Sequence, residues 1–151
     1  MVDIGATEQI ETPILEKVLN PEEIKGPAET AIMDIRAIKE KVKRLAPDAT
    51  STRGTVGGLQ YTFSMSSGGS ETLCISNWEE TNTKEIIIST GSDGVQQRPL
   101  LRYTEFKREK PGEPAKERIF FENTDKAEEQ IRKVIDETKT KLGINPQQQA
   151  A

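Results

Sequence analysis

Apolar residues in the first third of the chain recur at the spacing of a helix. Between residues 27 and 45 they fall three or four positions apart, and they are Ala28, Ala31, Ile32, Ile35, Ile38, Val42 and Leu45. Lysine and arginine gather at the end of this stretch, where the helix dipole favours positive charge, and Pro47 follows. The pattern predicts a long amphipathic helix.

Two shorter elements are expected upstream of this helix. Residues 12–19 carry a capping threonine, a proline and an apolar stripe, which is typical of a short helix. Asn20 and Glu23 have the spacing of a second helix start, and Gly26-Pro27 is expected to break the chain again. We therefore expect residues 1–26 to form short helical turns with freedom to move.

Strict alternation replaces the helical spacing over residues 59–65. Leu59, Tyr61, Phe63 and Met65 share one side of a predicted strand, and polar residues occupy the other side. Turn sequences then separate four further strands, near residues 72–78, 84–90, 99–108 and 117–122. The glycine-rich stretch 48–58 is interpreted as a loop. Strands joined by short turns predict an antiparallel meander.

The chain is expected to close with a helix capped by Asn123 or Thr124 and ended by Gly143. Its apolar stripe is Ala127, Ile131, Val134, Ile135 and Leu142. The predicted fold class is α+β, with N-terminal helices, a five-stranded antiparallel meander sheet and a C-terminal amphipathic helix packed on the sheet. Residues 27–143 are expected to be a single domain and residues 144–151 a disordered tail.

Composition removes several classes of chemistry. The 151 residues include no histidine and one cysteine, so Ser-His, Cys-His and His-metal mechanisms are excluded. Cys74 alternates with strand residues and is interpreted as a packing residue. We expect no catalytic residue, no resident metal and no cofactor.

A metal-dependent nuclease is one alternative that the remaining residue types allow. Asp93, Glu105 and Lys107 have the outline of a site in which two carboxylates hold a divalent cation and a lysine orients water. The same residues are more simply explained by a turn and an exposed charge ladder, because 30% of the chain is charged.

The segment from residue 98 to residue 122 is predicted to be a basic hairpin that contains aromatic residues. Binding candidates are Trp78, Arg102, Tyr103, Phe106 and Arg108. Acidic residues interleaved with the basic ones and a net charge of −4 disfavour nucleic acid as the partner. The leading hypothesis is a non-enzymatic accessory, adaptor or assembly protein that docks through its sheet face, its sheet edge or this hairpin. We expect the partner to be another protein chain, and a second copy of this chain is one option.

A small-molecule or lipid carrier is the other alternative. The order of helices and strands is similar to the helix-grip arrangement, in which a curved sheet wraps a helix around a cavity. Only 33% of residues are hydrophobic, which leaves little lining for such a cavity. The chain start lacks the pattern of a secretory signal and the sequence has no long apolar run, so we expect a soluble, cytoplasmic protein without a membrane segment.

Overall fold

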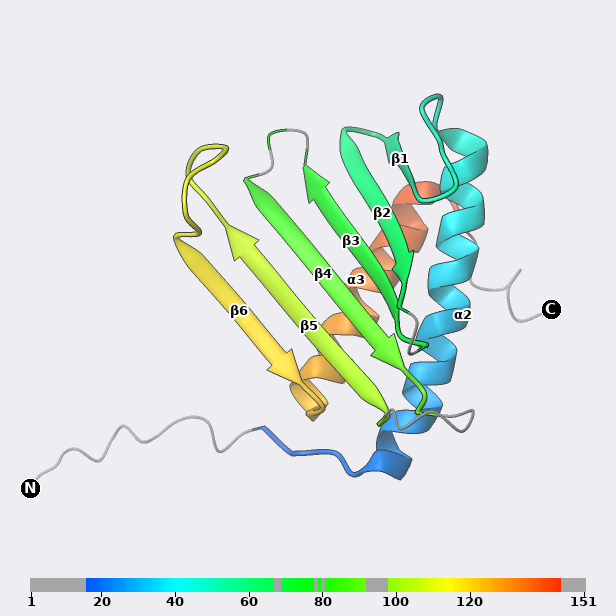
Figure 1. The fold of residues 1–151 in the computed structure, drawn as a ribbon, viewed down its shortest axis with the longest axis vertical. Helices are drawn as coiled ribbons and strands as arrows, with labels where there is room; N and C mark the ends of the chain where they lie inside the picture. The colour runs from blue at the N-terminus through cyan, green and yellow to red at the C-terminus, as the bar shows by residue number, and fades with distance from the viewer. Residues whose placement is uncertain (1–15, 67–68, 78, 80, 92–97, 145–151) are drawn as a thin grey trace, which may run out of the picture.

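The computed structural model describes residues 16–66, 69–77, 79, 81–91 and 98–144, and within them the chain forms an α+β fold (Figure 1). The elements in chain order are α2 (Pro21–Leu45), β1 (Arg53–Val56), β2 (Leu59–Met65), β3 (Glu71–Asn77), β4 (Asn82–Ser89), β5 (Leu100–Lys107), β6 (Glu117–Glu122) and α3 (Asp125–Leu142). The strands form one sheet in the order β1-β2-β3-β4-β5-β6. Every neighbouring pair is antiparallel, so the predicted meander is confirmed.

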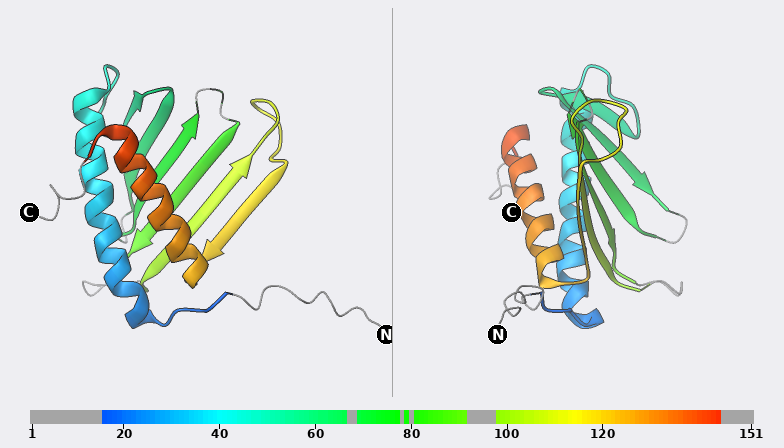
Figure 2. Two further views of the ribbon diagram at one scale, coloured as in Figure 1. Left: turned by 180° about the vertical axis from the view of Figure 1, so that it is seen from behind. Right: turned by 90° about the vertical axis from the view of Figure 1, so that its left-hand side faces the viewer.

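Both helices lie on the same face of the sheet (Figure 2). Helix α2 contacts β1, β4 and β5, helix α3 contacts β5 and β6, and the two helices contact each other. The opposite face is not covered by any element that the structure describes. The molecule therefore has two layers and one open sheet face, which we call the open face.

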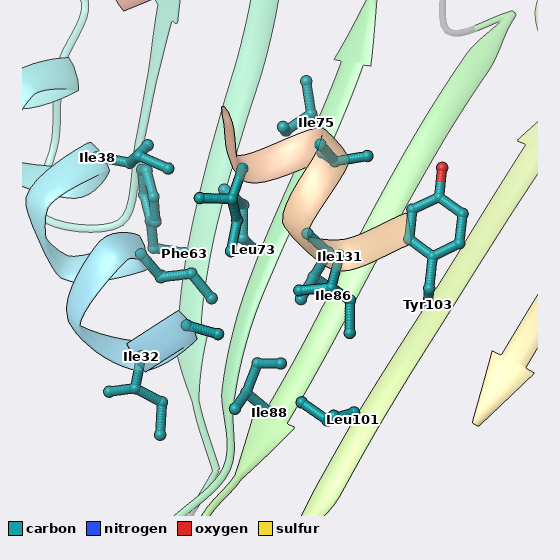
Figure 3. Packing of buried hydrophobic residues seen from close by; sticks show 14 of the residues in the cluster. Ile32, Ile38, Phe63, Leu73, Ile75, Ile86, Ile88, Leu101, Tyr103 and Ile131 are labelled. Carbon is teal, nitrogen blue, oxygen red and sulfur yellow. The ribbon is translucent and has the colours of Figure 1, made fainter. Parts of the chain in front are cut away.

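The core fills the space between the helices and the sheet (Figure 3). The sheet supplies Tyr61, Phe63, Leu73, Ile75, Ile86, Ile88, Leu101 and Tyr103. The helices supply the stripes predicted from the sequence except Leu45 of α2, which is exposed. An ion pair also joins the two helices, since Lys139 Nζ on α3 lies 3.1 Å from Asp34 Oδ1 on α2 with both side chains largely buried. The predicted packing of the closing helix on the sheet is confirmed.

Helix α2 is longer than the sequence pattern indicated. It begins at Pro21 and runs through Gly26 and Pro27, so the expected break there is wrong and the expected boundary at residue 26 falls inside the helix. Proline disfavours a helical conformation of the residue before it through a clash with that residue's N–H and Cβ, and glycine removes the part of the clash that involves Cβ. Burial of Ile24 and Ala28 on either side of this step also favours continuation. The predicted start is confirmed, because Asn20 and Glu23 form a capping box.

The expected helix over residues 12–19 is wrong where the structure describes it. Residues 16–19 are extended, and Val18 forms an antiparallel bridge with Thr124 at the start of α3. The backbone N–H of Leu19 donates to the carbonyl of Asn123. Long-range pairing therefore outweighs the local helical pattern, and residues 12–15 lie outside the described residues.

The sheet has six strands, and the expected number of five is wrong because β1 was interpreted as a loop. Gly57 and Gly58 have positive φ angles of 60° and 81° and form the two-residue turn between β1 and β2. Gly54 lies in β1 opposite Tyr61, and a side chain at this position would point at α2. A short glycine-containing strand can pair here because α2 approaches it closely.

The other element boundaries lie close to the predicted ones. Thr124 caps α3, and Gly143 ends it with a φ of 77° in the left-handed region. Ile144, which was placed in the disordered tail, packs against the core and donates its N–H to the carbonyl of Lys139. Residues 145–151 of the expected tail lie outside the described residues.

Candidate interaction surface

The open face carries polar and small side chains over β2 and β3 and larger ones over β5 and β6. Residues 101 and 103 of β5 are buried under the helices, so residues 102, 104 and 106 face the other way. The strand register places Arg118 opposite Phe106, Phe120 opposite Thr104, and Glu122 opposite Arg102. Arginine and phenylalanine side chains thus gather on one face of neighbouring strands.

These side chains form a continuous series, which we call the Arg–Phe row. In spatial order its members are Arg102, Phe120, Arg118, Phe106 and Arg108. The Arg102 guanidinium lies 6.0 Å from the centre of the Phe120 ring, and Arg118 lies 5.8 Å from the same ring. Arg118 also lies 5.5 Å from the Phe106 ring, and Arg108 lies 5.7 Å from it. Attraction between each cation and the ring faces orders the row.

The row has more positive than negative charge. Arg102 Nε donates to Glu122 Oε1 at 2.8 Å, whereas Arg108 Nε donates to the backbone carbonyl of Glu113 at 3.0 Å. Arg118 makes no ion pair with a carboxylate in the part of the chain that the structure describes. Phe120 remains 48% exposed. The row therefore offers guanidinium donors and an apolar ring to a partner.

The structure brings together three of the five binding candidates. Arg102, Phe106 and Arg108 belong to the row. Tyr103 lies on the opposite face and is 1% exposed, and Trp78 lies outside the described residues. Sequence reasoning missed Arg118 and Phe120, although alternation within residues 117–122 places them on one face and was a usable signal.

Glu105 shares the helix-covered side of β5 with Tyr103. The Tyr103 hydroxyl donates to Glu105 Oε1 at 2.7 Å, and Asn82 Nδ2 donates to Glu105 Oε2 at 3.1 Å. Burial raises the pKa of Glu105, but these two hydrogen bonds and the charges of Lys84 and Lys107 outweigh it, so the pKa is lowered overall. Burial and the nearby Glu105 carboxylate raise the pKa of Tyr103.

The nuclease alternative depends on Glu105, Lys107 and Asp93. Lys107 Nζ lies 3.9 Å from Glu105 Oε2, and both carboxylate oxygens of Glu105 already accept hydrogen bonds from the protein. Asp93 lies outside the described residues. The described residues contain no group of three acidic or cysteine side chains placed to hold a metal ion. Within the described residues, Glu105 is therefore held by hydrogen bonds from Tyr103 and Asn82.

Cys74 lies on the open face, opposite Thr62 and Glu85 in the neighbouring strands. Burial raises the pKa of its thiol, and the carboxylate of Glu85 raises it further. A raised pKa keeps the sulfur protonated near neutral pH, and a thiol is a much weaker nucleophile than a thiolate. This environment suits a packing residue.

Two hollows bear on the carrier alternative. A groove of about 420 Å³ runs between α2 and the strands β2 and β3, with Arg36, Lys39, Phe63 and Met65 in its lining. A second hollow of about 110 Å³ lies between α3 and the end of the sheet. Core side chains fill the space between the sheet and the helices, which is where a helix-grip cavity would lie.

The fold and the row define an α+β protein with two helices on one sheet face and a basic, aromatic surface on the other. Comparison with known proteins gives no match, since no protein-family description, no curated protein and no solved structure is significantly similar to the chain. No helix in the described ranges is both long enough and apolar enough to cross a membrane.

Proposed function

We propose that this chain is a non-enzymatic protein-interaction module that docks another protein on the open face over β5 and β6. The Arg–Phe row is the observation that carries the proposal. Arginine and aromatic residues contribute most of the binding energy in many protein interfaces, because they combine a large contact area with directed hydrogen bonds. The helix-covered face supports this assignment, since it is filled by the core and leaves the open face for a partner.

Phe106 and Arg108 provide the test, because they belong to the row but lie on β5 and just beyond it, away from the sheet edge. The full chain is used to capture partners, and the stoichiometric partner is purified and titrated by calorimetry. Phe106→Ala and Arg108→Gln are each expected to weaken binding by about tenfold or more, because each removes a central contact. Thermal unfolding of both variants checks that they remain folded.

Arg53→Gln is the matched control. Arg53 is exposed on the same face, because it pairs with Thr62 in the register, but it lies on β1 at the other edge of the sheet. Its replacement is expected to leave the affinity unchanged. Equal affinities for all variants would remove the row from the interface. Tight binding of single-stranded RNA or DNA at physiological salt, lost in the row variants alone, would assign the row to nucleic acid instead.

A further inference from the structure

Strand β6 is one of the two outer strands of the sheet, and no strand among the described residues pairs with its outer edge (Figure 1). The N–H of Asn123 donates to the carbonyl of Leu101, so the odd-numbered residues of β6 are those that bond to β5. The backbone groups of Arg118, Phe120 and Glu122 consequently point outward. Such a row of free N–H and C=O groups is a template for another strand.

The sequence of β6, Glu-Arg-Ile-Phe-Phe-Glu, is complementary to itself in the antiparallel direction. If a two-fold axis passes through Phe120, Arg118 lies opposite Glu122 of the partner subunit, and Glu122 lies opposite Arg118 of the partner subunit. The outward-pointing backbone groups are those of the same three residues, so they meet in this register as hydrogen-bonded pairs. On the helix-covered side, Ile119 faces Phe121 of the partner subunit.

We propose that two copies of this chain pair along β6 in this register and form one continuous antiparallel sheet. The pairing supplies Arg118 with a carboxylate, which it lacks in the described part of a single chain. It also places the exposed Phe120 ring against Phe120 of the partner subunit. Opposite charges and aromatic rings directly across two strands are the pairs that stabilise a sheet.

The outer edge of β6 is accessible over the same residues that the proposed pairing uses. Beyond Glu122, the edge is taken by the N-terminal segment, since Val18 bridges Thr124 and Leu19 bonds to Asn123. Before Glu117, the chain turns away in the loop that follows Lys107. The edge that remains open therefore covers the six residues of β6, which contain all the members of the proposed pairs.

A two-fold axis perpendicular to the sheet keeps the helices of both copies on one side and both Arg–Phe rows on the other. The two rows would then meet at Phe120 and form one surface. The pairing itself does not depend on the proposed docking function, because its residues lie on β6 and the docking test uses residues of the neighbouring strand and loop. A short edge contact buries less area than a standard interface, so we expect a dimer that dissociates on dilution.

Sedimentation velocity of the full chain tests the pairing over a concentration series from micromolar to millimolar. Wild type is expected to shift from monomer to dimer. Arg118→Glu and Glu122→Arg are each expected to remain monomeric, because each places like charges opposite one another across the axis. An equimolar mixture of these two variants is expected to dimerise, since every cross-strand pair in the mixed dimer is again of opposite charge.

This recovery on mixing is specific to the proposed register. Wild type that stays monomeric at millimolar concentration would overturn the proposal, as would a mixture that stays monomeric or single variants that dimerise like wild type. Phe120→Pro provides a second variant, because proline removes the outward N–H donor without removing a hydrogen bond to β5. It is expected to be monomeric with circular dichroism like that of wild type. Arg53→Glu, on the opposite edge, is expected to dimerise normally.

Discussion

Glu105, which the sequence pattern allows in a nuclease site, accepts two hydrogen bonds from the protein in this sheet. Its carboxylate lies at the border of the core, with 12% of the side chain exposed, and it accepts hydrogen bonds from Tyr103 and Asn82. Burial raises the pKa of Glu105, but these donors and the charges of Lys84 and Lys107 together outweigh it, so the pKa lies below the ordinary value of 4.5. The folded state therefore binds the Glu105 proton more weakly than the unfolded chain does.

Because the folded pKa of Glu105 is lowered, its ionisation stabilises the fold above the unfolded value of 4.5, and this stabilisation is lost as the pH falls through the folded value. Glu105→Gln removes the titrating group. We expect the variant to be less stable than wild type at pH values well above 4.5, and the difference in unfolding free energy to shrink on acidification. Urea unfolding at a series of pH values measures this difference.

Glu113→Gln is the control for this prediction, because Glu113 is exposed in the loop before β6. Its effect on stability is expected to stay small at every pH in the series. A stability difference between wild type and Glu105→Gln that does not change with pH would show that Glu105 keeps its ordinary pKa in the fold.

Alternation along β5 predicts which face of the sheet each of its aromatic residues occupies. Tyr103 and Phe106 were both proposed as binding residues, yet Tyr103 shares its face with Leu101 and Phe106 shares its face with Arg102. The period of two already separates them in the sequence. What the sequence could not provide was the register with β6, because pairing joins Phe106 to Arg118 across a loop of residues with no apolar pattern.

At the scale of elements, the contact between β1 and α2 depends on a glycine. A Cβ atom added to Gly54 would lie 2.8 Å from Ala46 Cβ and 2.8 Å from Val42 Cγ1, which is shorter than a van der Waals contact. Gly54→Ala is therefore expected to lower the unfolding free energy by about 1 to 3 kcal/mol through overpacking. Chemical denaturation monitored by circular dichroism measures the change.

Two further variants separate overpacking from a general effect on the strand. Arg53→Ala changes the neighbouring residue on the open face and is expected to alter stability by less than about 0.5 kcal/mol. Val42→Ala creates space beside Gly54, so the double variant with Gly54→Ala should lose less stability than the sum of the two single variants. Additive losses would mean that the added methyl group does not meet Val42.

The elements that the sequence predicted well are those in which local pattern and tertiary packing agree. The apolar stripe of α3, its threonine cap and its final glycine all lie in the same chain segment, so a local reading finds them. Local pattern and tertiary packing disagree in strand β1 and in the first part of α2. β1 is stabilised by β2 and α2 despite a weak pattern of its own, and α2 continues through Gly26-Pro27 because its flanking residues are buried. Both features depend on contacts that a local pattern does not contain.

At the scale of the whole molecule, the six strands are consecutive in sequence, whereas the two helices that cover them come from opposite ends of the described chain. Helix α2 precedes the sheet and α3 follows it, and they meet over the same face through Lys139 and Asp34 among other contacts. Neighbouring strands can pair early because their contacts are local in sequence. The core is complete only when both α2 and α3 pack on the sheet.

A chain truncated after Asn123 is therefore expected to lose cooperative unfolding, although it retains every strand of the sheet. Without α3, the side chains of Leu101, Tyr103 and their neighbours would be exposed to water on one face. We expect strand structure by circular dichroism, strong binding of a hydrophobic dye and a broad thermal transition, which are the properties of a loosely packed state. Truncation after Ile144 is the control, since it keeps both helices and should unfold cooperatively. A sharp transition in the shorter chain would mean that α2 and the sheet form a complete core, and that α3 is an addition to the fold.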